Sequence, residues 1–135
     1  MKKAVIYADG ASSGNPGVSG IGVVVALENK TYEISEHIGI ATNNVAEYSA
    51  LIRGLEKAAE LDAESVEVFL DSELLVRQMT GAYKVKNENL IPLWRRAREL
   101  SSSFRFFSIS HIPRELNKQA DKLAKKGAAP PAARL

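Results

Sequence analysis

Four acidic residues of this sequence could together do chemistry, because they fall where an α/β fold gathers polar side chains. Asp9 and Asp71 each follow directly after a short apolar run that is typical of a buried strand. Glu47 lies in the first turn of a predicted helix, and Asp121 lies within the last predicted helix. Since ligands of open α/β sheets bind beyond the carboxyl ends of the parallel strands, acids at that edge are good candidates for a site.

Carboxylates that share a sheet edge favour a divalent cation. If the two strands are parallel neighbours, their ends lie about 5 Å apart, so Asp9 and Asp71 would repel each other unless a cation or a shared proton neutralised them. The chain has no cysteine, which excludes disulfides, thiolate ligands and thiol nucleophiles. An all-oxygen site of this kind favours Mg²⁺ or Mn²⁺.

Each acid also has an interpretation that needs no ligand. The four alternatives are a turn at Asp9-Gly10, a capping box in Asn44-x-x-Glu47, a helix N-cap at Asp71-Ser72, and an i,i+4 ion pair between Asp121 and Lys125. Taken singly, each acid is explained at least as well by its structural role. Taken together, two repelling acids at one edge are better explained by a shared ion.

The elements that would position these acids follow from the apolar pattern. Strands are expected at 4–8, 21–27, 32–39, 66–70 and 104–110, and helices at 43–61, 73–80, 90–100 and 115–126. The segment 10–17 holds three glycines, an asparagine and a proline, which predicts a loop. The first three strands should form an antiparallel meander, and helical connections should make later strands parallel. The predicted fold class is therefore mixed α/β.

The composition agrees with one soluble globular domain. The chain has 135 residues, with 18 Lys+Arg against 16 Asp+Glu, a net charge of +2 that by itself identifies no partner. No apolar run reaches the length of about 18 residues that a membrane span needs, and no signal peptide is evident. We expect a cytoplasmic monomer with one domain at 1–128 and a frayed tail at 129–135.

Four blocks of the sequence resemble, in order, those of the type 1 ribonuclease H family. They are Tyr7-x-Asp9-Gly10-x-x-x-Gly14-Asn15-Pro16-Gly17, Thr42-Asn43-Asn44-x-x-Glu47, Asp71-Ser72 and Asn117-x-x-x-Asp121-x-Leu-Ala124. No single block is specific, but four ordered blocks at predicted element ends are a strong signal. The resemblance spans about residues 3–126 and implies a ribonuclease H-like fold, with a five-stranded mixed sheet flanked by helices.

The resemblance implies a metal-dependent endonuclease that cuts the RNA strand of RNA–DNA hybrids, leaving 3′-hydroxyl and 5′-phosphate ends. Asp9, Glu47, Asp71 and Asp121 match the family's metal-binding acids. Asp9 would bridge two Mg²⁺ ions, for which Mn²⁺ is a possible substitute. Asp121 would hold the ion that activates water, and Glu47 and Asp71 the ion at the leaving oxygen. The alternatives are a non-catalytic nucleic-acid-binding module on the same fold and a related nuclease that acts on DNA.

The same resemblance assigns substrate contacts. Gly10, Asn15 and Asn43 match residues that touch 2′-hydroxyls and minor-groove edges, while Thr42 and Asn44 match contacts to the DNA strand. A 2′-hydroxyl is what distinguishes RNA from DNA at a given position. Cleavage is therefore expected to depend on the shape of the hybrid rather than on its base sequence.

The sequence departs from the family pattern in two places. The connector 81–89 lacks the basic, tryptophan-bearing protrusion of many bacterial members, and its Tyr83 is either a channel-lining aromatic or an ordinary core residue. His111 stands ten residues before Asp121, the interval of the family's proton-shuttling histidine, but no glycine follows it. His111 is thus either that shuttle or a half-buried strand-end residue, and Arg114 is the competing candidate for contact with the scissile phosphate.

Overall fold

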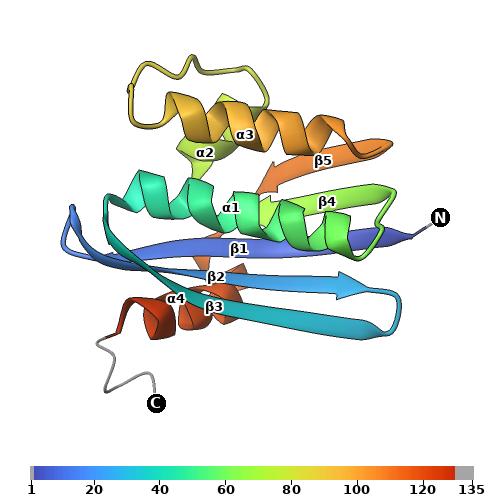
Figure 1. Cartoon of the computed structure of the whole chain (residues 1–135), viewed down its shortest axis with the longest axis horizontal. Coiled ribbons are helices and arrows are strands. Elements are labelled where there is room, and N and C mark those ends of the chain that lie inside the picture. Colours follow the sequence, from blue (N-terminus) through green and yellow to red (C-terminus); the bar gives the residue numbers. More distant parts are fainter. Residues whose placement is uncertain (1, 130–135) are drawn as a thin grey trace.

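A computed structural model describes residues 2–129 as a five-stranded sheet with helices on both faces (Figure 1). The strands are β1 (Lys3–Ser13), β2 (Gly17–Leu27), β3 (Lys30–Ala41), β4 (Ser65–Leu70) and β5 (Phe106–His111). The helices are α1 (Asn43–Glu60), α2 (Glu73–Met79), α3 (Ile91–Ser102) and α4 (Lys118–Ala128), with a short 3₁₀ turn, η1 (Arg114–Leu116), before α4. Residues 130–135 of the predicted C-terminal tail lie outside the described residues.

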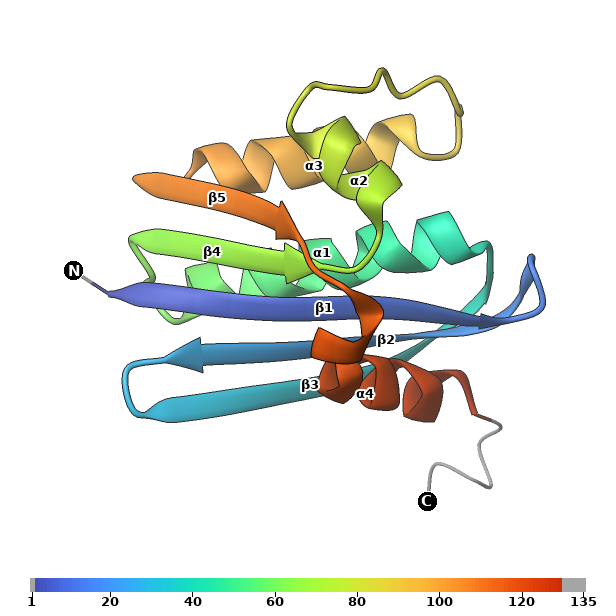
Figure 2. The same ribbon diagram turned by 180° about the vertical axis from the view of Figure 1, so that it is seen from behind.

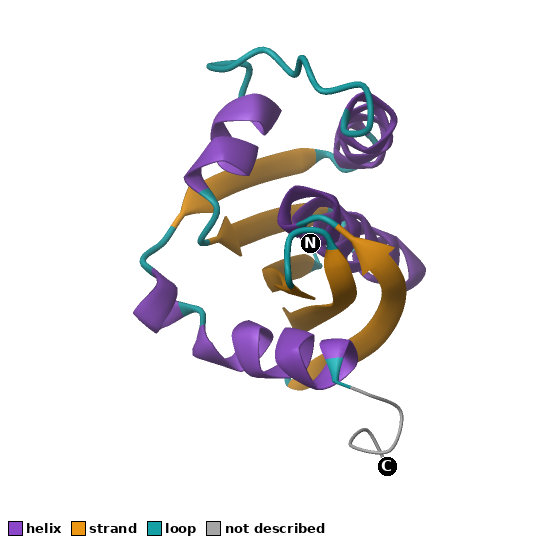
Figure 3. Cartoon of the chain, turned by 90° about the vertical axis from the view of Figure 1, so that its left-hand side faces the viewer, coloured by secondary structure: helices purple, strands orange, loops and turns teal. Residues whose placement is uncertain are grey.

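The sheet has the predicted mixed topology, in the order β3-β2-β1-β4-β5. β2 pairs antiparallel with both β1 and β3, whereas β4 pairs parallel with both β1 and β5. α1 lies on one face with α3 beside it, and α4 crosses β1, β2 and β3 on the opposite face (Figures 2 and 3). The five-stranded mixed sheet flanked by helices, which the sequence predicts, is therefore confirmed.

The core lies between the sheet and α1, and alternating side chains build it. Ala4, Ile6 and Ala8 point to this side of β1 and are fully buried, as are Leu51 and Leu55 of α1. Burial of one such leucine or isoleucine stabilises the fold by about 1.5–3 kcal/mol. This packing fixes the position of α1 over the central strand, and therefore the position of the side chains at the start of α1.

The prediction of a loop at 10–17 is wrong for most of that segment. β1 continues to Ser13 and β2 begins at Gly17, so that only residues 14–16 form the turn. Gly10 to Ser13 pair with Ile21 to Val18 of β2, which satisfies their backbone groups despite the glycine-rich composition. The hairpin therefore extends well beyond Asp9, and Asp9 lies within a paired strand instead of at the mouth of a loop.

The last predicted helix is also interrupted. The segment 115–126 was expected to be continuous, but η1 ends at Leu116, and Asn117 takes a non-helical conformation (φ −119°, ψ 28°) before α4 begins. The side chain of Asn117 is turned into the protein, where it bonds to β1 and to Asp71. A tertiary contact that local propensity does not encode therefore breaks the helix.

No helix among the described residues is long and apolar enough to cross a membrane. The connector between α2 and α3, residues 80–90, contains no further helix. The connector is therefore short and carries no helical protrusion, as the sequence predicts.

Candidate metal centre

Parallel pairing of β1 with β4 brings Asp9 and Asp71 to the same edge of the sheet. The last pair in this register is Ala8 with Leu70, and each acid is the next residue of its chain. The expectation that the two strand ends lie side by side is confirmed. The turn proposed for Asp9-Gly10 does not occur, because both residues pair with β2.

Glu47 reaches this edge from the first turns of α1, on a backbone held very close to β1. A Cβ atom placed on Gly10 would lie 2.4 Å from the carbonyl carbon of Ala46, so only glycine permits this approach. The amide of Gly10 then donates a hydrogen bond of 2.6 Å to Oε1 of Glu47. The N-cap of α1 is Thr42, whose Oγ1 accepts from the amide of Val45, so the capping box expected at Asn44 is not formed.

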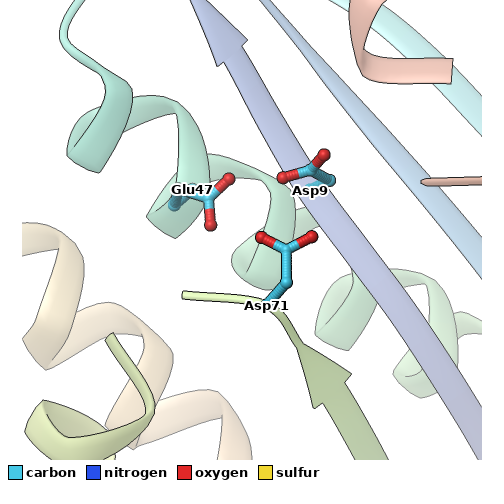
Figure 4. A group of neighbouring side chains, drawn as sticks. All are labelled: Asp9, Glu47 and Asp71. Carbon is cyan, nitrogen blue, oxygen red and sulfur yellow. The ribbon is translucent and has the colours of Figure 1, made fainter. Parts of the chain in front are cut away.

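Three carboxylates meet at this point. Asp9, Glu47 and Asp71 each offer an oxygen atom, and these atoms all lie within 4.8 Å of one another (Figure 4). Asp9 is 6% exposed and Glu47 is 9% exposed. Hard oxygen ligands grouped at this spacing fit a divalent cation such as Mg²⁺ or Mn²⁺, and they are unsuited to a soft metal.

The electrostatics of the cluster indicate the same need for a cation. Burial raises the pKa of Asp9 from 3.8 to about 10, with further contributions from the neighbouring carboxyls, Glu47 first. Burial also raises the pKa of Glu47, although hydrogen bonds from Asp9 and Gly10 and the charge of Arg114 act in the opposite direction. Without an ion the cluster therefore retains protons, which a bound cation would displace.

Asp9, Glu47 and Asp71 line a surface hollow, and Asp121 lines the same hollow in a different electrostatic environment. Its Oδ2 forms an ion pair with Nζ of Lys125 at 3.0 Å, and its side chain is 28% exposed. Burial alone would raise the pKa of Asp121, but the hydrogen bonds and charges of Lys125, Asp9 and Arg114 lower it overall. The predicted i,i+4 pair therefore forms, and it lies within the site instead of replacing it.

The hollow contains some of the predicted substrate residues and omits others. Gly10, Asn43, Asn44 and Arg114 line it together with the four acids. The remaining predicted residues, Asn15, Thr42 and His111, are not part of its lining. Two of these three have structural roles beside it. Oδ1 of Asn15 accepts from the amide of Asn43 at 3.0 Å, and Thr42 caps α1.

His111 and Tyr83 do not line the hollow of the carboxylates, and each lies near residues of α2. His111 is exposed at the end of β5, so the half-buried interpretation is wrong, and it lines a separate hollow together with Arg77 and Glu73. Tyr83 is 48% exposed, with the Arg77 guanidinium 5.4 Å from its ring centroid, so it is not a core residue. Of the two competing candidates, Arg114 is the one that faces the carboxylates.

Two residues that the sequence analysis gave no role in the site belong to it. Lys125 lines the hollow, and Asn117 is buried directly behind it, bonded to Asp71. The available signal was helical spacing, since Asn117, Asp121 and Lys125 recur at intervals of four residues. That spacing predicts that the three residues share one side of the helix, but it does not show whether that side faces the carboxylates.

The raised carboxyl pKa values predict that the metal-free domain loses stability as the pH rises from about 5 to 9. In this range folded Asp9 keeps a proton that the unfolded chain has already released, so the folded state binds more protons and unfolding becomes easier with increasing pH. Glu47 acts in the same direction. Melting temperatures recorded in EDTA should therefore fall with pH, and saturating Mg²⁺ should remove most of the fall.

The control for this experiment is Asp9→Asn, in which the slope of melting temperature against pH should be clearly smaller. A metal-free melting temperature that is constant or rises between pH 5 and 9 would contradict the electrostatic description of the cluster.

Comparison with known proteins agrees with the fold. A family model described as reverse transcriptase-like matches residues 7–127. A bifunctional protein of Mycobacterium tuberculosis is 46% identical over 125 residues, which cover 90% of this chain and 34% of the relative. Ribonuclease HI of Halobacterium salinarum is 44% identical over 87% of this chain and 60% of its own length. The chain thus spans about a third of the first relative and three fifths of the second.

Solved structures give the same result. The N-terminal RNase H domain of the M. tuberculosis protein superposes with a TM-score of 0.90 at 45% identity, covering 94% of this chain and 99% of that one. RNase H1 of H. salinarum gives 0.89 at 42% identity, with 93% and 96% covered. LC11-RNase H1, solved in complex with an RNA/DNA hybrid, gives 0.85 at 43% identity, also with 93% and 96% covered.

The fold and its acidic edge define a ribonuclease H-like domain. Within that class, the chain belongs to the type 1 ribonuclease H family.

Proposed function

We propose that this domain is a metal-dependent endonuclease that hydrolyses the RNA strand of RNA–DNA hybrids to 3′-hydroxyl and 5′-phosphate ends. The observation that carries the proposal is the cluster of three carboxylates within 4.8 Å at the carboxyl edge of β1 and β4. A relative of 43% identity that was solved with an RNA/DNA hybrid supports the choice of substrate. All four acids come from a single chain, which is consistent with a monomer.

In this proposal Asp9, Glu47, Asp71 and Asp121 hold two Mg²⁺ ions, and Mn²⁺ can substitute. Asp9 would serve both ions, Asp121 would serve the side of the attacking water, and Glu47 and Asp71 would serve the side of the leaving 3′ oxygen. Two bound ions supply an activated water and neutralise the charge that develops on the leaving oxygen. None of the acids then has to act as the general base, so they can remain ligands throughout.

The lining of the hollow supports recognition of RNA in the minor groove. Gly10 and Asn43 present backbone and amide groups beside the acids, and Asn44 lies next to them at the start of α1. Asn15 contributes through the hydrogen bond that its Oδ1 accepts from the backbone amide of Asn43, which ties the β1–β2 turn to that helix start. Donors and acceptors placed here would read 2′-hydroxyls and leave the base sequence unread. Thr42 acts as the N-cap that orders this segment.

The test is cleavage of an end-labelled RNA–DNA hybrid beside RNA–RNA and DNA–DNA duplexes of the same sequence, in Mg²⁺ and in Mn²⁺. We expect internal cuts in the RNA of the hybrid and none in the DNA duplex. Binding of the hybrid without cleavage in either metal would instead favour a non-catalytic nucleic-acid-binding module. Cuts in the DNA duplex would favour a nuclease of different specificity.

Arg114→Ala is expected to lower the rate of hybrid cleavage about 10²-fold, the usual cost of removing one group that stabilises transition-state charge. Arg114 lines the hollow of the carboxylates, and its charge reaches both Glu47 and Asp121. His111→Ala should change the rate by less than about 3-fold, because His111 lies in the neighbouring hollow. Single-turnover cleavage at saturating enzyme measures both effects.

Arg95→Ala on the exposed side of α3 is the matched control for loss of a positive charge. A larger loss in His111→Ala than in Arg114→Ala would reverse the assignment and restore the proton-shuttle role of His111.

A further inference from the structure

We propose that Asn117 is a positioning residue that holds the Asp71 carboxylate in place for metal binding; this inference rests on the proposed function. Asn117 lies between η1 and α4 and is 2% exposed. Its Nδ2 donates to the carbonyl oxygen of Ala8 at 2.9 Å and to Oδ2 of Asp71 at 3.0 Å. One amide group therefore joins the start of α4 to the residue before Asp9 and to Asp71 itself.

The chemistry of the partners fixes the orientation of this amide. An asparagine side chain has two N–H donors on Nδ2 and an acceptor oxygen. The Ala8 carbonyl oxygen and the Asp71 carboxylate oxygen are both acceptors in these contacts, so a flipped amide would place oxygen against oxygen at both. Asn117 therefore acts as a double donor, and both of its N–H groups are used.

Local stability of the helix does not explain this arrangement. Asparagine is a favoured N-cap because its side-chain oxygen can accept from a free amide in the first turn. Asn117 is the N-cap of α4, yet its side chain makes no capping hydrogen bond. Its Oδ1 is the one buried side-chain polar atom without a partner among the described residues. The side chain gives up the capping role and instead directs its donors toward Ala8 and Asp71.

A neutral donor suits a metal-ligating carboxylate. Asp121 is paired with the cation of Lys125, which a metal ion would have to displace or tolerate. Asn117 instead restrains Oδ2 of Asp71 by hydrogen bonding, without adding a charge that competes with the ion. Loss of a group that orients a metal ligand in this way commonly lowers metal affinity or activity by about 10- to 100-fold.

The test compares Asn117→Ala and Asn117→Asp with the wild-type domain. Asn117→Ala removes both donors, and the isosteric Asn117→Asp replaces them with an acceptor facing Ala8 and Asp71. We expect the Mg²⁺ concentration that produces a given rise in melting temperature to increase about 10-fold or more. Half-saturation of cleavage should shift in parallel, while KM for the hybrid at saturating Mg²⁺ stays within about 2-fold.

Ser19→Ala is the matched control for the loss of a buried donor. The Ser19 hydroxyl is fully buried and donates to the carbonyl oxygens of Gly17 and Ala41, away from the carboxylates. This variant should melt earlier and keep its Mg²⁺ dependence. If Asn117→Asp does not fold, Asn117→Ala at reduced temperature, checked for folding by circular dichroism, carries the test.

An unchanged Mg²⁺ dependence in folded Asn117→Ala would overturn the proposal and leave Asn117 a purely structural residue. The melting measurement needs no cleavage, so it separates the two hypotheses. A wild-type domain that binds Mg²⁺ but cuts no hybrid would refute the proposed function. The positioning role would then still be decided by the difference between wild type and variant in the Mg²⁺ dependence of the melting temperature.

Discussion

Asp9→Asn should lower cleavage of an RNA–DNA hybrid about 10³-fold or more, since metal ions supply several kcal/mol of transition-state stabilisation and each 1.4 kcal/mol or so is tenfold in rate. Asp9 lies in the central strand β1, where its carboxylate meets those of Glu47 on α1 and Asp71 after β4 (Figure 4), and it is the acid expected to be shared by both ions. Removing its charge should therefore disturb both halves of the site. Single-turnover cleavage in Mg²⁺ and in Mn²⁺ measures the loss.

The same substitution should raise the stability of the metal-free domain at neutral pH. Burial and the adjacent carboxyls raise the pKa of Asp9 to about 10, so the folded state disfavours its charged form. Asparagine has nearly the same shape and no charge, and it relieves that cost. We expect a metal-free melting temperature at pH 7.5 that is equal to or above that of the wild type. Loss of activity in a more stable protein cannot be attributed to misfolding.

Asp62→Asn provides the matched control, because Asp62 is exposed at the far end of α1. It should leave cleavage and the Mg²⁺-induced rise in melting temperature unchanged. Retention of more than about a tenth of the wild-type rate in Asp9→Asn would be incompatible with a shared metal ligand at this position.

The sequence predicted the carboxylate cluster because its position depends on simple rules. Apolar runs mark the strands that precede Asp9 and Asp71, and helical connections make those strands parallel. Once the two strands are neighbours in register, the acids after them must lie at one edge. Glu47 follows from the N-terminus of a helix that packs over the same strand. These relations involve one strand pair and one helix face, which periodicity can resolve.

Features that depend on contacts between distant segments could not be predicted in this way. The extension of β1 to Ser13 requires pairing with β2 that the glycine-rich composition conceals. The break at Asn117 depends on acceptors 109 and 46 residues away in the chain. The preference for Arg114 over His111 depends on the path of η1 after β5, which no local pattern specifies.

The close packing of α4 against β2 also depends on a contact between distant segments of the chain, and Gly22→Ala should disrupt it. Gly22 pairs with Asp9 in the β1–β2 register. A Cβ atom on Gly22 would lie 2.1 Å from the carbonyl oxygen of Ala120 and 2.4 Å from the amide nitrogen of Ala124. Both are backbone atoms of α4, so no change of side-chain conformation relieves the clash, and the helix must move away from β2.

Displacement of α4 affects both stability and chemistry, because this helix carries Asp121 and follows directly on its N-cap, Asn117. Overpacking of this severity should cost about 3 kcal/mol or more, which corresponds to a melting temperature lower by about 10 °C or more in a domain of this size. Movement of the Asp121 carboxylate away from Asp9 by about 1 Å should also lower hybrid cleavage about 10²-fold in the fraction that remains folded. Thermal melting and single-turnover cleavage below the melting transition measure the two effects separately.

Gly54→Ala is the matched control, since it places a methyl group of the same size on the opposite face of the sheet. Its Cβ atom would meet side-chain carbons of Ile6 at 2.9 Å and Val23 at 3.1 Å, which can shift, and alanine favours the interior of α1. This variant should lose less stability than Gly22→Ala and should retain its Mg²⁺ dependence. Equal effects of the two substitutions on cleavage would mean that general destabilisation, and not the position of α4, limits the activity. A smaller loss of cleavage in Gly22→Ala than in Gly54→Ala would show that α4 can move without disturbing the carboxylates. Asp121 would then not need the close approach that Gly22 permits.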